Sequence, residues 1–461
     1  MRAQPVDNAK PARPQDQPSP RGLPPAMLFG GYALLCLTPL VLAALQGHPA
    51  RNLFRELSSG LVMVGYVMTL LQFMLSGRFG WLSGQIGIDR TMRFHQVASW
   101  AILILIIAHP FLYVVPRLAS GPMEALAALN RMFLSPRLFS GVVAWVLLIL
   151  LVPMAIFRDR LPFRYELWRL SHGVMAIAIA LFGTHHTLQV GTYSADRWLA
   201  AFWIAATILA LLAMLQIYVL KPLLKRRAAY RVVLNRKVAD RMWELAVEPE
   251  RGDAMRFAAG QFVWLNLGHS PFSLTEHPFS ISSAPVDRPR IAFTIKESGD
   301  FTGQIGKIAP GTRAYLDGPH GNFTLAGRQG RGVVFIAGGV GFAPIMGILR
   351  QLGAERYPHA VRLIYGNRVE TQILYREEIE TLKRALNFEV DYVLSEPPPG
   401  WSGLTGELTP DILGRCLPDA GGGDWLYYLC GPLPMMDSVE SALMARGIPR
   451  AKIVSERFKY Q

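Results

Sequence analysis

Six apolar runs, each long enough to cross a membrane as a helix, lie in the first half of this 461-residue chain. About 20 apolar residues in an α-helix span the hydrocarbon core of a bilayer, which is roughly 30 Å thick. The composition suits such a chain, because 51% of the residues are hydrophobic and only 17% are charged. We therefore expect a bundle of six transmembrane helices at Met27–Leu45, Leu57–Leu75, Gln96–Val115, Leu138–Phe157, Leu170–Leu188 and Trp198–Leu220.

The net charge of +14 is distributed in a way that predicts an orientation. With the N-terminus inside, residues 1–26, 78–93, 158–169 and 221–227 hold fifteen Lys and Arg, whereas the opposite loops hold six. Cytoplasmic loops carry such an excess of cations. This predicts a multi-pass protein of the plasma (inner) membrane, in contact with lipid, with both termini cytoplasmic; it disfavours nucleic acid as a partner. Residues 1–26 are proline-rich and indicate a disordered cytoplasmic tail rather than a signal peptide.

Four histidines share one spacing within these apolar runs. His95, directly before the third run, lies fourteen residues from His109 within it, and His172 lies fourteen residues from His186 in the fifth run. On a helix this spacing spans ~21 Å and returns to within ~40° of the same face. A histidine in hydrocarbon is costly, and a hydrogen bond to a neighbouring helix explains any single one. The shared spacing instead favours two haems held by bis-histidine ligation, with His185 as the alternative to His186.

The pairing follows from the predicted topology. His95 with His172 would ligate an inner haem, and His109 with His186 an outer one. Two imidazoles leave the iron no open position, so such haems would carry electrons. The three cysteines, Cys36, Cys416 and Cys430, are too few for a disulfide framework or a four-cysteine iron–sulfur cluster.

From about Tyr230 onward, short strands follow one another closely and predict a small antiparallel β-barrel. A run at Glu276–Ser283 offers aromatic edges, hydroxyls and backbone donors to a flat, phosphate-bearing ligand. The turn Gly299–Gly303 leads into a helical segment, which suits either a phosphate or a plain turn. The expected strands are Tyr230–Asn235, Met242–Glu248, Gln261–Leu267, Phe279–Ser282, Ile291–Lys296 and Arg313–Leu316.

The last section reads as strand, glycine-rich turn and helix. Val333–Ala337 is a buried strand, and Gly338–Pro344 opens a helix that runs to Leu352. Glycines there allow a dinucleotide's phosphates to approach the backbone, although the spacing differs from the six-residue fingerprint. Further alternation predicts a parallel sheet with helices. Arg368 follows the second strand and could meet a 2′-phosphate, which favours NADPH slightly over NADH; a solvent-facing arginine is the alternative.

The order of the motifs carries a resemblance. His277-Pro278-Phe279-Ser280, the glycine turn, Cys430-Gly431-Pro432-Leu433-Pro434-Met435 and Glu456-Arg457-Phe458 follow the order of the ferredoxin–NADP reductase superfamily. With six spans and paired histidines before them, the chain resembles a bacterial NADPH oxidase or ferric reductase-like transmembrane flavocytochrome b. The resemblance implies a transmembrane haem domain (27–220), an FAD-binding β-barrel (226–328) and a Rossmann-like α/β NAD(P)-binding domain (329–461).

The resemblance also implies roles. Cys430 would lie beside the nicotinamide, and Phe458 would cover the flavin until the nicotinamide displaces it; a packed C-terminal residue is the alternative for Phe458. Residues implied to bind the cofactors are His277, Pro278, Phe279, Ser280, Ser282, Lys296, Thr302, Gly338, Gly339, Gly341, Pro344, Arg368, Gly431 and Pro432.

The expected function is that of an oxidoreductase. Electrons would pass from cytoplasmic NAD(P)H through FAD and two b-type haems to an acceptor at the outer face. Oxygen, reduced to superoxide, is the first candidate acceptor. A ferric chelate is an alternative, and so is a quinone or protein partner. Animal NADPH oxidases have a further histidine four residues beyond the outer ligand, where this chain has Tyr113.

Overall fold

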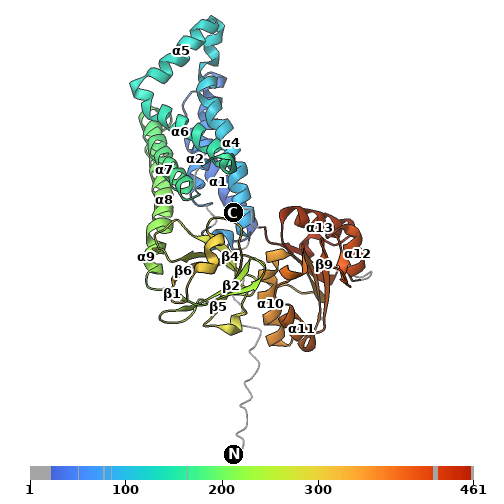
Figure 1. The fold of residues 1–461 in the computed structure, drawn as a ribbon. Coiled ribbons are helices and arrows are strands. Elements are labelled where there is room, and N and C mark those ends of the chain that lie inside the picture. Colours follow the sequence, from blue (N-terminus) through green and yellow to red (C-terminus); the bar gives the residue numbers. More distant parts are fainter. Residues whose placement is uncertain are drawn as a thin grey trace, which may run out of the picture. The chain divides into compact units, whose positions relative to one another are not determined.

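The computed structural model describes residues 22–49, 51–75, 78–84, 86–162, 165–418 and 424–457. The predictions made for residues 1–21 and for Phe458 lie outside these ranges. Contacts within the chain define a helical unit, Gly22–Leu223, and an α/β unit that begins at Leu224. Figure 1 shows the helices and strands of both units, coloured along the sequence.

In the helical unit, six helices of the described chain are long and apolar enough to cross a membrane. Each coincides with one of the six predicted runs, so that prediction is confirmed. Many of their large apolar side chains are exposed, Leu34 and Ile104 among them, as expected of a surface that faces lipid. The helices are α1 (Pro25–Ala44), α2 (Leu53–Leu71), α4 (Ile88–Val114), α6 (Phe139–Ile156), α7 (Tyr165–Val190) and α8 (Arg197–Leu215). Shorter helices are α3 (Gly80–Ser83), α5 (Pro122–Leu134) and α9 (Lys221–Lys225), which continues into the α/β unit.

Helices α4 and α7, which carry the paired histidines, lie across from each other in a group of four. Each of them packs on both α2 and α6. One apolar cluster joins all four helices and includes Ile102 of α4 and Ile179 of α7, both almost fully buried. Each of these isoleucines lies seven residues after the first histidine of its helix. An apolar layer therefore separates the two levels at which the histidines lie.

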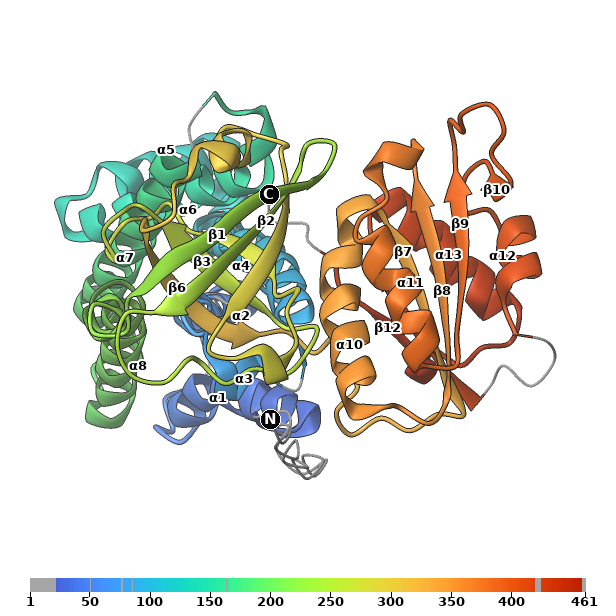
Figure 2. The same ribbon diagram turned by 60° about the horizontal axis from the view of Figure 1, so that its bottom comes forward.

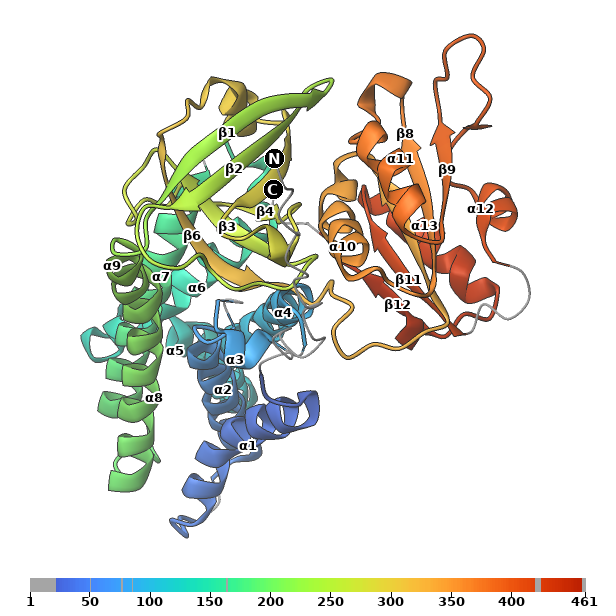
Figure 3. The same cartoon turned by 90° about the horizontal axis from the view of Figure 1, so that it is seen from below.

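The first part of the α/β unit is a six-stranded antiparallel sheet with the order β4-β3-β6-β1-β2-β5. Beyond β4, a single bridge between Ile281 and Phe293 joins the two edges, so the sheet curls around its core (Figure 3). All six predicted strands are present. Their bounds are β1 (Tyr230–Ala239), β2 (Met242–Pro249), β3 (Phe262–Leu267), β4 (His277–Ser280), β5 (Ile291–Lys296) and β6 (Arg313–His320).

The second part is a parallel sheet with the order β10-β9-β8-β7-β11-β12. Helices α10 and α11 cover one face and α12 and α13 the other (Figure 2). The strands are β7 (Gly332–Gly338), β8 (Ala360–Asn367), β9 (Phe388–Leu394), β10 (Leu404–Thr405), β11 (Trp425–Cys430) and β12 (Ile453–Ser455). The helices are α10 (Phe342–Glu355), α11 (Arg376–Ala385), α12 (Pro410–Cys416) and α13 (Leu433–Ala445).

Strand β7 comes first in sequence but lies inside this sheet, with β8 on one side and β11 on the other. The chain therefore leaves β7 in one direction and later returns to its other side. In open α/β sheets, ligands bind at such a switch point, outside the carboxyl ends of the strands. The glycine turn after β7 and the Cys430–Pro432 turn after β11 both lie at that edge.

Candidate functional site

The structure brings the four paired histidines together as two pairs. His95 lies within electrostatic range of His172, and His109 within that of His186. Each pair joins α4 to α7, and the two pairs lie at the two levels separated by the apolar layer. One imidazole from each of two helices is a suitable donor set for one haem iron.

Neighbouring helices hold the pair His109–His186 in place. The Nδ1 atom of His109 lies 2.8 Å from Ser58 Oγ and 3.2 Å from the Ser58 carbonyl oxygen on α2, so its other nitrogen remains available. The ring of His186 lies against Gly141 of α6, where a Cβ atom would overlap it. His185 is exposed, and its Nδ1 lies 2.9 Å from Ser140 Oγ. Of the two neighbours, His186 is therefore the one that approaches His109.

In the curled sheet, the two segments expected to bind a flavin meet through their aromatic rings. His277 at the start of β4 stacks on Phe301, with ring centres 4.2 Å apart. Phe279 is also nearly parallel to Phe301, with ring centres 6.2 Å apart. Phe301 lies in the turn just before Thr302. Since a flat ring system can stack on such a cluster, β4 and this turn form one candidate site. Phe301 is a member of this site that was not singled out from the sequence.

The hydroxyls of this region differ in their partners. Thr302 Oγ1 accepts hydrogen bonds from the backbone N–H groups of Ser298 (2.9 Å) and Gly299 (3.1 Å), and still has its own proton to donate. Ser280 is buried at the end of β4. Ser282 Oγ is fully buried and has no hydrogen-bond partner among the described residues. Lys296 is exposed at the end of β5.

At the switch point of the parallel sheet, three glycines allow β7 and β11 to approach each other. A Cβ at Gly341 would overlap the Cys430 carbonyl group. A Cβ at Gly338 would lie 2.6 Å from Met435 Sδ, and one at Gly431 would lie 3.0 Å from the Gly338 nitrogen. Gly339, in contrast, has open space around it and a φ angle of +53°. The backbone of this turn is therefore closely packed at Gly338 and Gly341 and open at Gly339.

The remaining expected residues line the same edge. Pro344 lies buried in the first turn of α10, and Cys430 is 2% exposed. Pro432 precedes α13 and contacts the position of a Cβ at Gly338. Arg368 follows β8 with its guanidinium largely exposed, 3.9 Å from Glu396. It lies beyond the carboxyl end of β8, at the same edge of the sheet as the glycine turn.

A tyrosine that sequence reasoning missed supports the glycine turn. The Tyr365 hydroxyl donates a hydrogen bond to the Gly339 carbonyl (3.1 Å), and its ring stacks on Phe342 at 4.5 Å. Burial raises the pKa of this hydroxyl, which therefore stays a donor at neutral pH. A tyrosine near the end of a strand has many structural uses, so the sequence carries no specific signal for this role.

Three family models match successive parts of the chain. Residues 61–183 match the ferric reductase like transmembrane component, residues 235–321 an FAD-binding domain and residues 335–441 an oxidoreductase NAD-binding domain.

Three curated relatives match the soluble half. Ferredoxin–NADP reductase B of Sorangium cellulosum is 33% identical over 50% of this chain and 96% of its own length. The reductase component of propane 2-monooxygenase of Rhodococcus jostii is 32% identical over 46% of this chain, and NADH-cytochrome b5 reductase 1 of Lodderomyces elongisporus is 32% identical over 35%. This chain covers only 59% and 54% of those last two proteins. Among solved structures, a flavohemoglobin of Malassezia yamatoensis aligns over 87% of this chain and 98% of its own, with 16% identity and a TM-score of 0.48.

Proposed function

This chain belongs to the family with the NADPH oxidase and ferric reductase architecture, whose soluble half is that of ferredoxin–NADP reductases, and from this membership we propose its reaction. As an NAD(P)H-dependent flavin oxidoreductase with membrane helices, it would pass electrons from cytoplasmic NAD(P)H through FAD and two b-type haems to an acceptor at the outer face. Oxygen, which would be reduced to superoxide, is the acceptor we propose first. The plasma membrane and cytoplasmic termini, inferred from the lysine and arginine distribution, are part of this proposal.

The observation that carries the proposal is the pairing of histidines on α4 and α7. His95 would hold the inner haem with His172, and His109 the outer haem with His186. The Nδ1 atoms of His172 and His186 are buried and have no hydrogen-bond partner among the described residues. The iron would instead be bound through Nε2, as at His109, whose Nδ1 is occupied by Ser58, so one imidazole from α4 and one from α7 fit a haem-bound group. The described residues hold no group of three or more His, Cys, Asp or Glu, but an axially ligated haem needs only two.

We assign FAD to β4 and the turn that contains Phe301. His277, Pro278, Phe279 and Ser280 would bind the flavin, with Thr302 towards its phosphates. FAD supplies the conversion between the two electrons of a hydride and the single electrons that haem iron accepts. The protein's own contribution is an aromatic surface, buried hydroxyls and the Thr302 hydroxyl, which still has its proton to donate. Ser282 and Lys296 are further proposed contacts.

We assign NAD(P)H to the switch point of the parallel sheet. Gly338, Gly339 and Gly341 would admit the phosphates close to the backbone, and Cys430 would border the nicotinamide. Pro344, Gly431 and Pro432 would shape the surrounding walls. Arg368 is exposed at the strand edge and would bind a 2′-phosphate, which supports NADPH over NADH.

A ferric chelate is the second candidate acceptor, and one observation favours keeping it. Four residues beyond His109, Tyr113 lies under the guanidinium of Arg55, whose carbon is 5.3 Å from the ring centre. Animal oxidases have a histidine at the position of Tyr113. The residues beside the outer haem would thus differ from those of an animal oxidase, while the positive charge of the half-buried Arg55 would suit an anionic chelate.

One assay distinguishes these acceptors. NADPH oxidation by the purified, FAD-supplemented protein is measured under argon with a ferric chelate, and in air with detection of superoxide. Argon is needed because superoxide itself reduces ferric chelates. Turnover only in air, with superoxide formed, supports the oxidase. Fast turnover with the chelate under argon indicates a ferric reductase rather than an oxidase. Failure of both reactions indicates a quinone or protein acceptor.

A further inference from the structure

Helix α10 links the two halves of the soluble unit through a backbone contact. It begins at Phe342, directly after the glycine turn, and it lies against residues 281–283, which directly follow β4. A Cβ at Gly347 would lie 2.8 Å from the Ile281 carbonyl oxygen and 3.1 Å from that of Ser283. Such close approach fixes the separation of the two segments and requires glycine on the helix.

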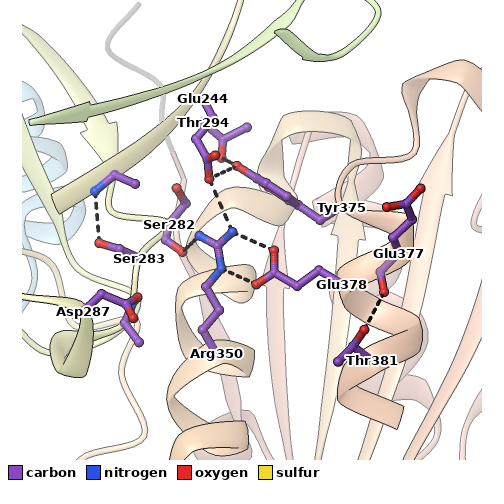
Figure 4. Close-up of polar contacts among 12 residues, drawn as sticks. Glu244, Ser282, Ser283, Asp287, Thr294, Arg350, Tyr375, Glu377, Glu378 and Thr381 are labelled. Atoms are coloured by element: carbon purple, nitrogen blue, oxygen red, sulfur yellow. Dashed lines mark hydrogen bonds and ion pairs between the residues drawn. The ribbon is translucent and has the colours of Figure 1, made fainter. Parts of the chain in front are cut away.

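Arg350, three residues later on the same face of α10, reinforces this contact (Figure 4). Its Nη1 donates to the Ser282 carbonyl oxygen (2.8 Å), and its Nη2 lies 3.3 Å from Glu244 Oε1 on β2. Its Nε and Nη2 also donate to Glu378 on α11, at 2.7 and 2.8 Å. One largely buried guanidinium therefore bonds to the curled sheet at two points and to its own domain at a third.

Tyr375 adds a parallel connection. Its ring lies under the Arg350 guanidinium at 4.8 Å, and its hydroxyl donates to Glu244 Oε1 (2.9 Å) and lies 2.8 Å from Thr294 Oγ1 on β5. Tyr375 adopts a left-handed conformation with φ +53°, which costs a non-glycine residue roughly 1–3 kcal/mol. The contacts of its side chain oppose that cost.

The charges of this cluster persist at neutral pH. Burial alone would raise the pKa of Glu244, but the hydrogen bond from Arg236 and the charge of Arg350 hold it below its usual value. Burial would lower the pKa of Arg350, but Glu378 and its other neighbours raise it. The cluster is therefore ionic. A buried ion pair is a weak source of stability, because desolvation offsets the attraction, but its directional bonds define a geometry.

We infer that Arg350, with Glu244 and Tyr375, is a positioning residue that holds the nicotinamide-binding turn in register with the flavin-binding strand. It lies eight residues after the start of α10, ~12 Å along the helix, and it grips the segment that continues β4. This inference rests on the proposed assignment of FAD and NAD(P)H to those two segments. The Arg350 cluster thus sets how closely the two ligands approach, without touching either.

The main test is Arg350→Lys, which keeps the charge but replaces a fork of donors by one nitrogen that cannot reach three acceptors. The matched control is Arg313→Lys, because Arg313 pairs with Glu250 at 2.9 Å within the curled sheet alone. Gly347→Ala is a second variant that separates the same segments and leaves every charge in place. All three are made in the full chain and compared at equal FAD and haem content.

Two measurements are made on each variant. Stopped-flow absorbance under argon gives the limiting rate of flavin reduction by NADPH and the NADPH concentration at half that rate. Hydrogen exchange gives the protection of residues 281–283 and α10. Since a misplacement of about 1 Å costs on the order of 10²-fold in rate, we expect the limiting rate to fall at least about tenfold in Arg350→Lys and Gly347→Ala. The half-saturating concentration stays within about twofold, because the nucleotide contacts are unchanged.

The outcomes separate this inference from the proposed function. Faster exchange at residues 281–283 with a slower limiting rate, and an unchanged Arg313→Lys control, supports positioning by Arg350. An unchanged limiting rate in both Arg350→Lys and Gly347→Ala, at full FAD content, overturns it. Parent protein whose flavin NADPH does not reduce would instead refute the cofactor assignment itself.

Discussion

At the scale of single residues, glycines without a Cβ atom shape the edge of the parallel sheet to which we assign NAD(P)H. Gly341 and Gly431 allow the turns after β7 and β11 to touch, and Tyr365 supports the turn from below. The glycine motif could be predicted from sequence, because close backbone approach requires glycine. The supports, Tyr365 and Arg350, could not, since their roles depend on partners far away in the chain.

Gly341→Ala should abolish efficient use of NAD(P)H. The added methyl group would overlap the Cys430 carbonyl, and overpacking of this kind costs about 1–3 kcal/mol or displaces the turn. We expect the KM for NADPH to rise while FAD content stays unchanged, measured by steady-state kinetics and flavin absorbance. Gly30→Ala is the control, because Gly30 has open space around it. Normal kinetics in Gly341→Ala would contradict the assigned site.

Arg368→Ala tests the nucleotide preference. If the exposed guanidinium binds the 2′-phosphate, its loss should weaken the binding of NADPH by about tenfold. This is the equivalent of one charge-assisted hydrogen bond. NADH lacks this phosphate and serves as the internal control. The ratio of kcat/KM for the two nucleotides is the quantity to compare, and an equal change for both would rule out this role.

Glu244→Gln tests the charge at the domain contact. Because the pKa of Glu244 is lowered in the folded state, its stabilising effect is complete above its ordinary pKa of about 4.5 and is lost as the pH falls through the lower folded value. At pH 7 the variant should release FAD at a lower temperature than the parent. We expect its free energy of unfolding to be lower by about 2 kcal/mol. The difference should shrink below pH 4. Glu248→Gln, which removes an exposed pair with Arg290, is the control and should show little change.

At the scale of elements, hydropathy predicted the six long helices, and a close succession of short strand-like segments predicted the strands of the curled sheet. Both signals are local and strong. Helix α5 escaped prediction because only thirteen residues form it and its apolar side chains, such as Met123 and Leu126, are exposed. The diagonal placement of α4 and α7 was also beyond the sequence, which gives the face of each helix but not its neighbours.

Gly141→Ala tests the packing of α6 on α7. The methyl group would enter the space of the His186 ring, and we expect altered spectra and midpoint potential for one haem of the two. Gly173→Ala on α7 is the matched control, since a Cβ there meets only the flexible end of Met214 at 3.4 Å.

His109→Ala should remove one haem outright and leave reduction of the flavin by NADPH intact. Unchanged haem spectra in both Gly141→Ala and His109→Ala would refute the outer pair.

At the scale of the whole molecule, the chain joins a membrane unit with paired histidines to a soluble unit with two nucleotide-binding folds. Each of these parts was predictable because each has its own sequence pattern. The acceptor was not, since it depends on the surface beside the outer pair, where Arg55 and Tyr113 interact. The claim that unites the parts is that electrons cross the membrane on haems.

The haem-to-protein ratio of the purified chain, followed by addition of NADPH under argon, tests that claim most directly. With two bis-histidine sites we predict about two b-type haems per chain. We further predict that NADPH reduces both of them in the presence of FAD, seen as sharpened haem absorbance bands. A preparation that retains FAD and reduces it with NADPH, but has no haem absorbance, would contradict the account.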